Sequence, residues 1–360
     1  MRRSRRLATF SALALALGLG APTVAGAAQK NVSLGPPKSA AKAINATGND
    51  VNDFFPHKVT IHVGDKVRFV ANNFHTVDLP GHRSRKLPLI TPVPQAISGV
   101  VDAAGVPFWF NGQPQVGFNR RLLTSAFGKS RSYTGQKAVL SGLPFANAPK
   151  PMTVKFTKTG TFRYFCDVHP GMQGFVKVVS SSSKVPTAAQ DRRTLRRQEA
   201  STLRTARALA KTPAPGANTV DVGAQGKGNT SFFAFIPNAL TVPAGTTVTF
   251  RMNAKSEVHT ATIGPGNPES EPQSYLGQVA AGFAKPVIDP RAAFPSDPPG
   301  ALAALTPTSH GNGFWNSGAL DRDSTTRTVP PSNAVTFAAP GTYQVFCMIH
   351  PFMHATVTVT

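Results

Sequence analysis

The sequence predicts an all-β protein with two β-sandwiches joined by a basic, helical linker. Apolar and polar residues alternate along many short runs, Gly and Pro are frequent (31 and 32 of 360 residues), and long amphipathic helical patterns are scarce. Alternation with a period of two is typical of half-buried strands. A segment near the middle of the chain also recurs at its C-terminal end. A duplicated all-β unit fits both the composition and the length.

The first expected element is an export signal over residues 1–27. Arginines precede an apolar run from Leu7 to about Leu19, and Ala25 and Ala27 suit a cleavage site of the Ala-x-Ala type. The run is short for a membrane span, and no later stretch approaches one. We therefore expect an exported chain, in the periplasm, the cell envelope or the extracellular space, with no transmembrane span after cleavage.

The next elements form two copies of one unit, residues 28–180 and 218–360. The stretch "GTFRYFCDVHPGMQGFVKVV" from Gly160 aligns without gaps on "GTYQVFCMIHPFMHATVTVT" from Gly341. Within each copy apolar residues recur at every second position, as in the C-terminal "HATVTVT". Each copy is therefore predicted to be a β-sandwich built from half-buried strands.

Residues 181–217 separate the two copies and form the predicted linker. The middle of this segment, about Thr187–Ala210, is rich in Ala, Arg and Leu, which favours a helix. Its apolar stripe is thin and consists of Leu195, Leu203 and Leu209. We expect a basic linker helix.

The net charge of the whole chain is +22. An excess of this size suits an acidic redox partner or an anionic cell-envelope surface, although solubility and compositional bias explain it equally well. Neither an aromatic RNA-binding signature nor a helix-turn-helix pattern is present in the sequence, so we expect no nucleic-acid partner.

Each copy carries the motif Cys-x-x-His-x-x-Met directly after a strand that ends in Phe. A second histidine, followed by Thr, comes after an earlier strand of the same copy. Cys, two His and Met are the ligands of a blue (type 1) copper site, in which a soft thiolate and two imidazoles surround the metal and a thioether binds weakly. The predicted ligands are His75, Cys166, His169 and Met172 in the first copy, and His259, Cys347, His350 and Met353 in the second.

In these motifs the sequence resembles the cupredoxin family, and "CMIHPFM" is most similar to the ligand loop of amicyanins. The resemblance covers the paired strands and the ligand loops of both copies. It implies two Greek-key β-sandwiches, one copper ion near one end of each, and electron transfer as the role. We therefore expect two type 1 copper sites that cycle between Cu(I) and Cu(II).

Two features depart from the family pattern. The long segments 81–147 and 264–328 separate the first histidine from the cysteine in each copy, and we expect them to cover the copper end and to shape partner access. Thr follows the first histidine where cupredoxins often have Asn, and Asp167 or Met348 follows the cysteine where they often have a hydroxyl residue. These neighbours leave the redox potentials open.

The sequence leaves several alternatives open. Exported proteins commonly form disulfides, so a Cys166–Cys347 bridge is the competing interpretation of the two cysteines. His82 and His310 could also approach a metal. A two-domain multicopper oxidase or nitrite reductase is a second functional hypothesis, but neither cysteine has a neighbouring histidine and the chain contains no His-x-His pair. Copper storage or delivery is a third, although six methionines do not make a Met-rich surface.

Overall fold

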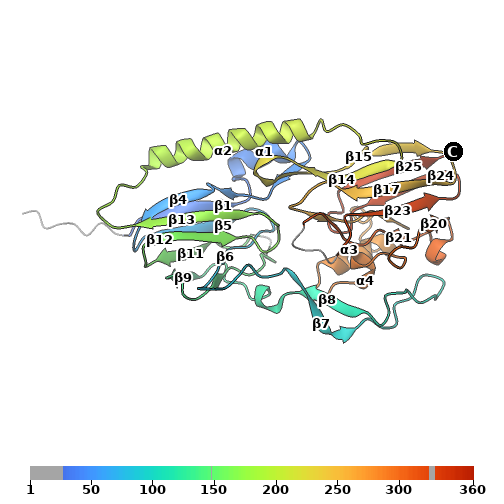
Figure 1. The fold of residues 1–360 in the computed structure, drawn as a ribbon, viewed down its shortest axis with the longest axis horizontal. Helices are drawn as coiled ribbons and strands as arrows, with labels where there is room; N and C mark the ends of the chain where they lie inside the picture. Colours follow the sequence, from blue (N-terminus) through green and yellow to red (C-terminus); the bar gives the residue numbers. More distant parts are fainter. Residues whose placement is uncertain (1–26, 147, 324–328) are drawn as a thin grey trace, which may run out of the picture.

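The computed structural model describes residues 27–146, 148–323 and 329–360, so the predicted export signal lies outside the described residues apart from its last position. Figure 1 shows two β-sandwiches next to each other, with one long helix lying along the first and ending near the edge of the second. The prediction of an all-β chain with two sandwiches and a helical linker is confirmed.

The first sandwich consists of two five-stranded sheets, with strand orders β3-β1-β5-β11-β9 and β10-β6-β12-β13-β4. Residues from both sheets, among them Phe69, Val154 and Tyr164, form one buried core. The alternating sequence explains this arrangement, because every second side chain of a strand points to the same face. The strands are β1 (Gln29–Leu34), β3 (Phe54–Phe55), β4 (Lys58–His62), β5 (Lys66–Ala71), β6 (Asp78–Leu79), β9 (Ser130–Tyr133), β10 (Val139–Leu140), β11 (Met152–Phe156), β12 (Gly160–Phe165) and β13 (Gln173–Val179).

The second sandwich has sheets of the orders β2-β15-β14-β17-β23-β20 and β16-β25-β24-β19-β21. Its core includes Phe250, Trp315 and Val357. Parallel and antiparallel pairs follow the same pattern as in the first sandwich: β14 pairs with β17 as β1 pairs with β5, and β24 with β25 as β12 with β13. The strands are β14 (Thr219–Gln225), β15 (Thr230–Ile236), β16 (Ala239–Val242), β17 (Thr246–Met252), β19 (Thr262–Ile263), β20 (Ala303–Leu305), β21 (Trp315–Asn316), β23 (Ser332–Phe337), β24 (Gly341–Phe346) and β25 (His354–Val359).

Two segments of the first half pack on the second sandwich. The strand β2 (Asn49–Val51), which follows helix α1 (Lys38–Asn45), pairs with β15 and extends its sheet. The hairpin of β7 (Ile90–Ala96) and β8 (Pro114–Phe118) lies under the second sandwich (Figure 1). Phe110, in the segment that joins its two strands, is buried in a cluster with Leu276 of the second half. The two sandwiches are therefore tied together by strand pairing and by a shared apolar cluster.

Short elements complete the second half and its ligand end. The small pair of β18 (Val258–His259) and β22 (Leu320–Asp321) carries one predicted ligand. The remaining elements are the helices α3 (Tyr275–Phe283) and α4 (Pro290–Ala293) and the 3-10 turns η1 (Arg120–Leu122), η2 (Lys227–Asn229) and η3 (Ser309–Gly311).

The predicted linker helix is α2 (Ala188–Leu209). It begins with a capping box in which the Thr187 side chain accepts from the Gln190 backbone and the Gln190 side chain accepts from the Thr187 backbone, which satisfies two N–H groups at the helix start. Leu195 and Leu203, from the thin apolar stripe, pack in a cluster with α1, β2 and β3. Within the described ranges, no helix combines the length and the apolar character needed to cross a membrane.

Candidate metal centres

The first predicted ligand set comes together at one end of the first sandwich. His75 follows β5, and the loop between β12 and β13 supplies Cys166 and His169. The Cys166 N–H donates to the Met172 carbonyl (3.0 Å) and the Met172 N–H to the His169 carbonyl (3.3 Å), so this loop closes as a tight turn. The motif spacing thus places three donor types on one short, hydrogen-bonded loop.

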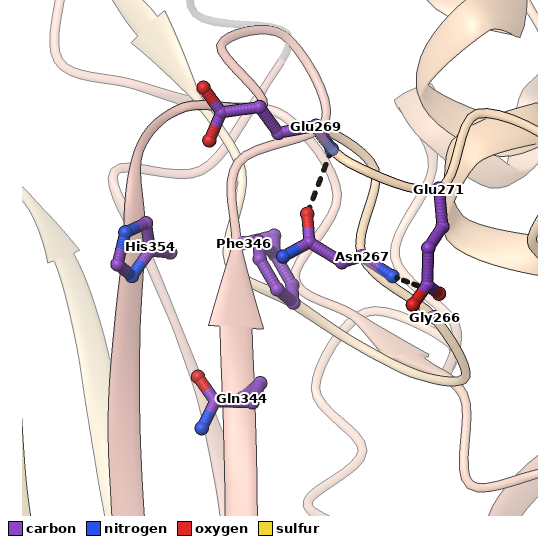
Figure 2. Close-up of a pocket in the computed structure, with 7 residues that line it drawn as sticks. All are labelled: Gly266, Asn267, Glu269, Glu271, Gln344, Phe346 and His354. Atoms are coloured by element: carbon purple, nitrogen blue, oxygen red, sulfur yellow. Dashed lines mark hydrogen bonds between the residues drawn. The ribbon is translucent and has the colours of Figure 1, made fainter.

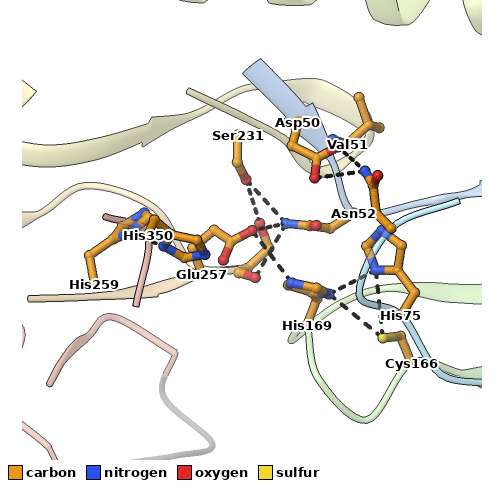
Figure 3. A network of polar contacts seen from close by, with 12 residues as sticks. Asp50, Val51, Asn52, His75, Cys166, His169, Ser231, Glu257, His259 and His350 are labelled. Carbon is orange, nitrogen blue, oxygen red and sulfur yellow. Dashed lines mark hydrogen bonds and ion pairs between the residues drawn. The ribbon is translucent and has the colours of Figure 1, made fainter. Parts of the chain in front are cut away.

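The donor atoms of this set form a compact triangle. His75 Nδ1 and His169 Nδ1 are 2.9 Å apart, and Cys166 Sγ lies 3.9 Å from the first and 3.7 Å from the second. The Met172 side chain is buried in the same core cluster as Cys166. Figure 3 shows the imidazoles and the thiol facing one another.

The second set repeats this geometry. His259 lies in β18, and the loop between β24 and β25 supplies Cys347 and His350. The two Nδ1 atoms are 3.0 Å apart, and Cys347 Sγ lies 3.7 Å from His259 Nδ1 and 3.8 Å from His350 Nδ1. Met353 is buried in the core cluster that contains Cys347.

Both triangles fit a metal ion bound by two imidazoles and a thiolate. Metal–nitrogen bonds of about 2.0 Å and metal–sulfur bonds of about 2.3 Å separate such donor atoms by roughly 3 to 4 Å. A buried thioether near two imidazoles and a thiolate is the donor set typical of type 1 copper. The structure brings the predicted residues of each set together, and their role as ligands stays a prediction.

Burial keeps the imidazoles in the neutral form that binds metals. It lowers the pKa of His75 to about 3 and that of His350 to about 4, and it lowers the pKa of His169 and of His259 well below the usual range. Burial also raises the pKa of both cysteine thiols. Metal binding must therefore displace a thiol proton at each site, while the imidazole lone pairs are already available.

A threonine ties the two ligand-bearing segments together in each site. The Thr76 N–H donates to Cys166 Sγ (3.4 Å), and its hydroxyl accepts from the Asp167 N–H (2.7 Å). In the second site the Thr260 N–H donates to Cys347 Sγ (3.4 Å), and its hydroxyl accepts from the Met348 N–H (2.8 Å). In the sequence these threonines were noted only as departures from the cupredoxin pattern. In the structure each threonine links the segment of the outer histidine to the segment of the cysteine.

A glycine lies behind the outer histidine of each site. Gly35 (φ 82°) and Gly223 (φ 78°) both have left-handed backbone conformations. A Cβ atom at Gly35 would lie 2.9 Å from His75 Nε2, and one at Gly223 would lie 3.0 Å from His259 Nε2. These positions require glycine because the backbone passes directly against the ring. Sequence inspection did not single them out, since each precedes its histidine by 36 or more positions.

The residue after the cysteine makes the two sites different. Asp167 is buried at the first site, where it accepts from the Thr76 hydroxyl (3.1 Å) and the Leu87 N–H (3.3 Å). Burial, and then the charge of Asp167, raise the pKa of the neighbouring Asp78 to about 7. Met348 at the second site instead joins an apolar cluster. The first site is therefore polar and acidic next to the sulfur, and the second is apolar.

The long segments contact both sites. Lys86 Nζ donates to the His169 carbonyl (3.4 Å) from the first long segment, and Phe110 of the same segment belongs to the cluster around Met348. The equivalent hydroxyls of Ser141 and Ser317 accept backbone N–H groups from the residues two places after the outer histidines (2.8 Å each). The expectation that these segments cover the ligand ends agrees with these contacts.

The other predicted candidates lie elsewhere. Both cysteines are free, and each belongs to its own histidine pair, so the Cys166–Cys347 bridge is absent. His310 stacks on Phe108 (4.9 Å between ring centroids) and lies 3.8 Å from an Asp102 oxygen, away from both ligand sets. His82 belongs to neither of the two donor clusters found in the described ranges.

Figure 2 shows a surface cavity of about 450 Å³ beside β24. Its loop is held by local hydrogen bonds: the Asn267 side chain accepts from the Glu269 backbone N–H (2.9 Å), and the Glu271 carboxylate accepts from the Asn267 backbone N–H (3.1 Å). None of the eight predicted ligands lines this cavity. It is lined by Gly266, Asn267, Glu269, Glu271, Gln344, Phe346 and His354.

The sequence matches no protein-family model, and no protein of curated function matches it. Among solved structures, an oxidised plastocyanin from Dryopteris crassirhizoma is similar at 23% identity, over 39% of this chain and 99% of that chain (TM-score 0.21). A purple cupredoxin from Nitrosopumilus maritimus is similar at 17% identity (39% and 98%, TM-score 0.20). An amicyanin from Paracoccus versutus is similar at 18% identity (42% and 88%, TM-score 0.22).

Proposed function

We propose that this chain is an exported electron-transfer protein that holds one type 1 copper ion in each sandwich. The observation that carries the proposal is the repeated donor set: two neutral imidazoles and one thiol in a triangle with edges of 2.9–3.9 Å, next to a buried methionine, in both halves. Copper supplies a one-electron change between Cu(I) and Cu(II) when it is bound by such ligands.

The residues around each triangle are arranged to keep its geometry fixed. The backbone N–H of Thr76 or Thr260 donates to the sulfur, which orients the thiolate and lowers its charge density. Gly35 and Gly223 close the rear of each outer imidazole. Both cysteines are fully buried, which excludes water from the sulfur. A rigid, dry site favours rapid electron transfer because little has to move when the charge changes.

In this proposal the protein carries electrons and does not catalyse a reaction. Each site offers four protein donors, and no histidine flanks Cys166 or Cys347 to lead electrons to a further metal. We infer that the two sandwiches arose by duplication of one unit, from the gapless match of their ligand loops. The redox partner is an acidic protein, or the basic chain associates with an anionic envelope surface.

Metal analysis with visible and electron paramagnetic resonance spectra of the full mature chain tests the function. We expect two copper ions per chain, an intense thiolate-to-copper absorption and narrow type 1 hyperfine splitting. Cys166→Ser and Cys347→Ser should each remove one copper and its absorption while the other site persists. Fewer than two copper ions after full reconstitution, or the absence of thiolate absorption, contradicts the proposal.

A further inference from the structure

The ligand end of the first sandwich is closed by the second half of the chain. The strand β2 pairs with β15 of the second half, and the backbone N–H of Asn52, which follows β2, donates to the Asn229 carbonyl (2.9 Å) of the β14–β15 turn. The His169 side chain is only 12% exposed. An external protein therefore has little access to the His169 imidazole.

The group that covers this imidazole is Glu257 of the second half. Its Oε1 lies 3.7 Å from His169 Nε2, and the carboxyl group is 3% exposed. Figure 3 shows Glu257 between the His75–His169 pair and the His259–His350 pair. A buried carboxyl group directed at the far nitrogen of a ligand histidine is the arrangement that orients the ring and its tautomer in metal sites.

Neighbouring polar groups hold Glu257 in place. The Asn52 side-chain amide donates to Glu257 Oε1 and to the Ser231 hydroxyl (3.3 Å), which in turn contacts the Ser256 hydroxyl (3.1 Å). All of these side chains are buried. The carboxyl group therefore has a fixed position, and a buried network of this kind is strongly destabilised when one member loses its partner.

Glu257 lies in a loop whose length differs between the two copies. Five residues separate Phe69 from His75, whereas eight separate Phe250 from His259. The three extra residues lengthen the loop that carries Glu257. This longer loop reaches the ligand of the other sandwich, although Glu257 is only two residues from a ligand of its own.

We propose that Glu257 joins the two metal centres: it positions the His169 ring of the first site and connects it, through two peptide units, to His259 of the second site. This inference rests on the proposed function. In the junction, one electron passes from Cu(I) at one site to Cu(II) at the other, and no covalent bond forms or breaks. The chain then works as an internal relay and not as two independent carriers.

One further observation agrees with this junction. The His350 ring stacks on Phe233 (4.7 Å, 23° between planes), and the neighbouring Phe352 is 52% exposed. The second site thus has an aromatic contact with solvent that an outside partner can use.

The first test is the copper affinity of each site, measured by chelator competition with Cu(II) added to the metal-free full-length chain. Glu257→Ala should weaken the first site by roughly 10- to 100-fold, as expected when a group that orients a ligand is lost, and should leave the second site within threefold. Glu257→Gln, which keeps a hydrogen-bonding oxygen, should restore most of the affinity. Glu269→Ala, an exposed carboxylate of the same half, is the matched control.

This selectivity separates the junction from a merely structural role. A loosened second half would weaken the second site, because Glu257 is two residues from His259. Equal loss at both sites, or an unchanged first site, overturns the positioning role. If Glu257→Ala does not fold, the pair Glu257→Leu with Asn52→Leu removes both hydrogen-bonding partners together, which avoids an unpaired buried amide.

The second test follows the electron itself. Pulse radiolysis with less than one electron per chain should give a fast reduction phase and then a second phase whose rate is independent of protein concentration. The spectra of Cys166→Ser and Cys347→Ser identify the two sites. The rate of the second phase should fall at least tenfold in Glu257→Ala. In Glu257→Gln this rate should stay within threefold of the wild-type value. Two intact blue sites without such a phase, or with one that Glu257→Ala leaves unchanged, overturn the junction and leave the proposed function standing; absence of copper overturns both.

Discussion

Asp167→Asn should raise the reduction potential of the first site and leave the second unchanged. Asp167 is 3% exposed, and its carboxyl group shares the Thr76 hydroxyl with the sulfur of Cys166. A buried negative charge near the metal favours the more positive oxidation state. Removing that charge while keeping the shape of the side chain should therefore make Cu(II) easier to reduce.

The magnitude follows from these contacts. The Thr76 hydroxyl oxygen is 3.8 Å from the sulfur and 3.1 Å from the Asp167 carboxyl oxygen, which brings the charge within about 7 Å of the sulfur. At an effective dielectric constant of about 20, one charge at about 7 Å contributes roughly 2.4 kcal/mol. Since 59 mV corresponds to about 1.4 kcal/mol for a one-electron couple, the expected shift is about 100 mV, or less where the nearby Lys86 compensates.

The assay is a spectroelectrochemical titration at about pH 8, above the pKa of about 7 that burial, and then the charge of Asp167, give Asp78. The first site is measured in a Cys347→Ser background. Met348→Asn in a Cys166→Ser background is the matched control, because it places the same amide at the equivalent position without removing a charge. A shift at the first site below about 20 mV, or an equal shift at both sites, would refute the electrostatic reasoning.

Three further predictions concern stability. Thr260→Val should lower the free energy of unfolding by about 1 to 3 kcal/mol in urea titrations, because the buried Met348 N–H loses its acceptor. An unchanged urea midpoint contradicts a stabilising role for this hydrogen bond. Hydrogen bonding to Asp53 raises the pKa of His57, so the stabilisation of the fold by protonated His57 is present below about pH 6.5 and is lost as pH rises through the raised pKa. The difference in Tm between the wild type and His57→Gln should therefore shrink as pH rises, and a difference that does not change with pH contradicts this prediction. Phe110→Ala should cost about 3 to 5 kcal/mol and, although it lies in the first half, should lower the unfolding midpoint of the second half, measured through its copper absorption; a shift confined to the first half excludes the shared cluster.

The sequence identifies which donor residues the structure brings together, because three of the four in each set are close in the chain: Cys, His and Met occupy one short loop after a strand. The outer histidine of each set is far from its cysteine in the sequence and was found because it occupies the equivalent place in both copies. The helix α2 was equally accessible, since its residues match the expected range from Thr187 to Ala210. The ligand loop and the helix both depend on spacing and composition over a short stretch of chain.

The remaining features depend on tertiary placement. Gly35 meets His75 only because two strands bring them together, and the partner of Glu257 lies 88 positions away, in the other sandwich. Likewise, nothing in the sequence of β2 indicates that it pairs with β15 of the second half. The second sandwich includes β2, which lies in the first predicted range, and the contacts that join the sandwiches cannot be found from a pattern along the chain.

The differences between the copies suggest why two similar sites are kept in one chain. Asp167 places a buried carboxyl group beside the first sulfur, whereas Met348 provides an apolar neighbour for the second. The same electrostatic argument that predicts the effect of Asp167→Asn therefore orders the wild-type potentials, with the second site higher. If Glu257 joins the sites as proposed, an electron held at the first site would move downhill to the second, whose aromatic face is exposed through Phe352. On this proposal the residue after the cysteine sets the order of the two potentials, and the longer loop before His259 supplies the junction between the sites.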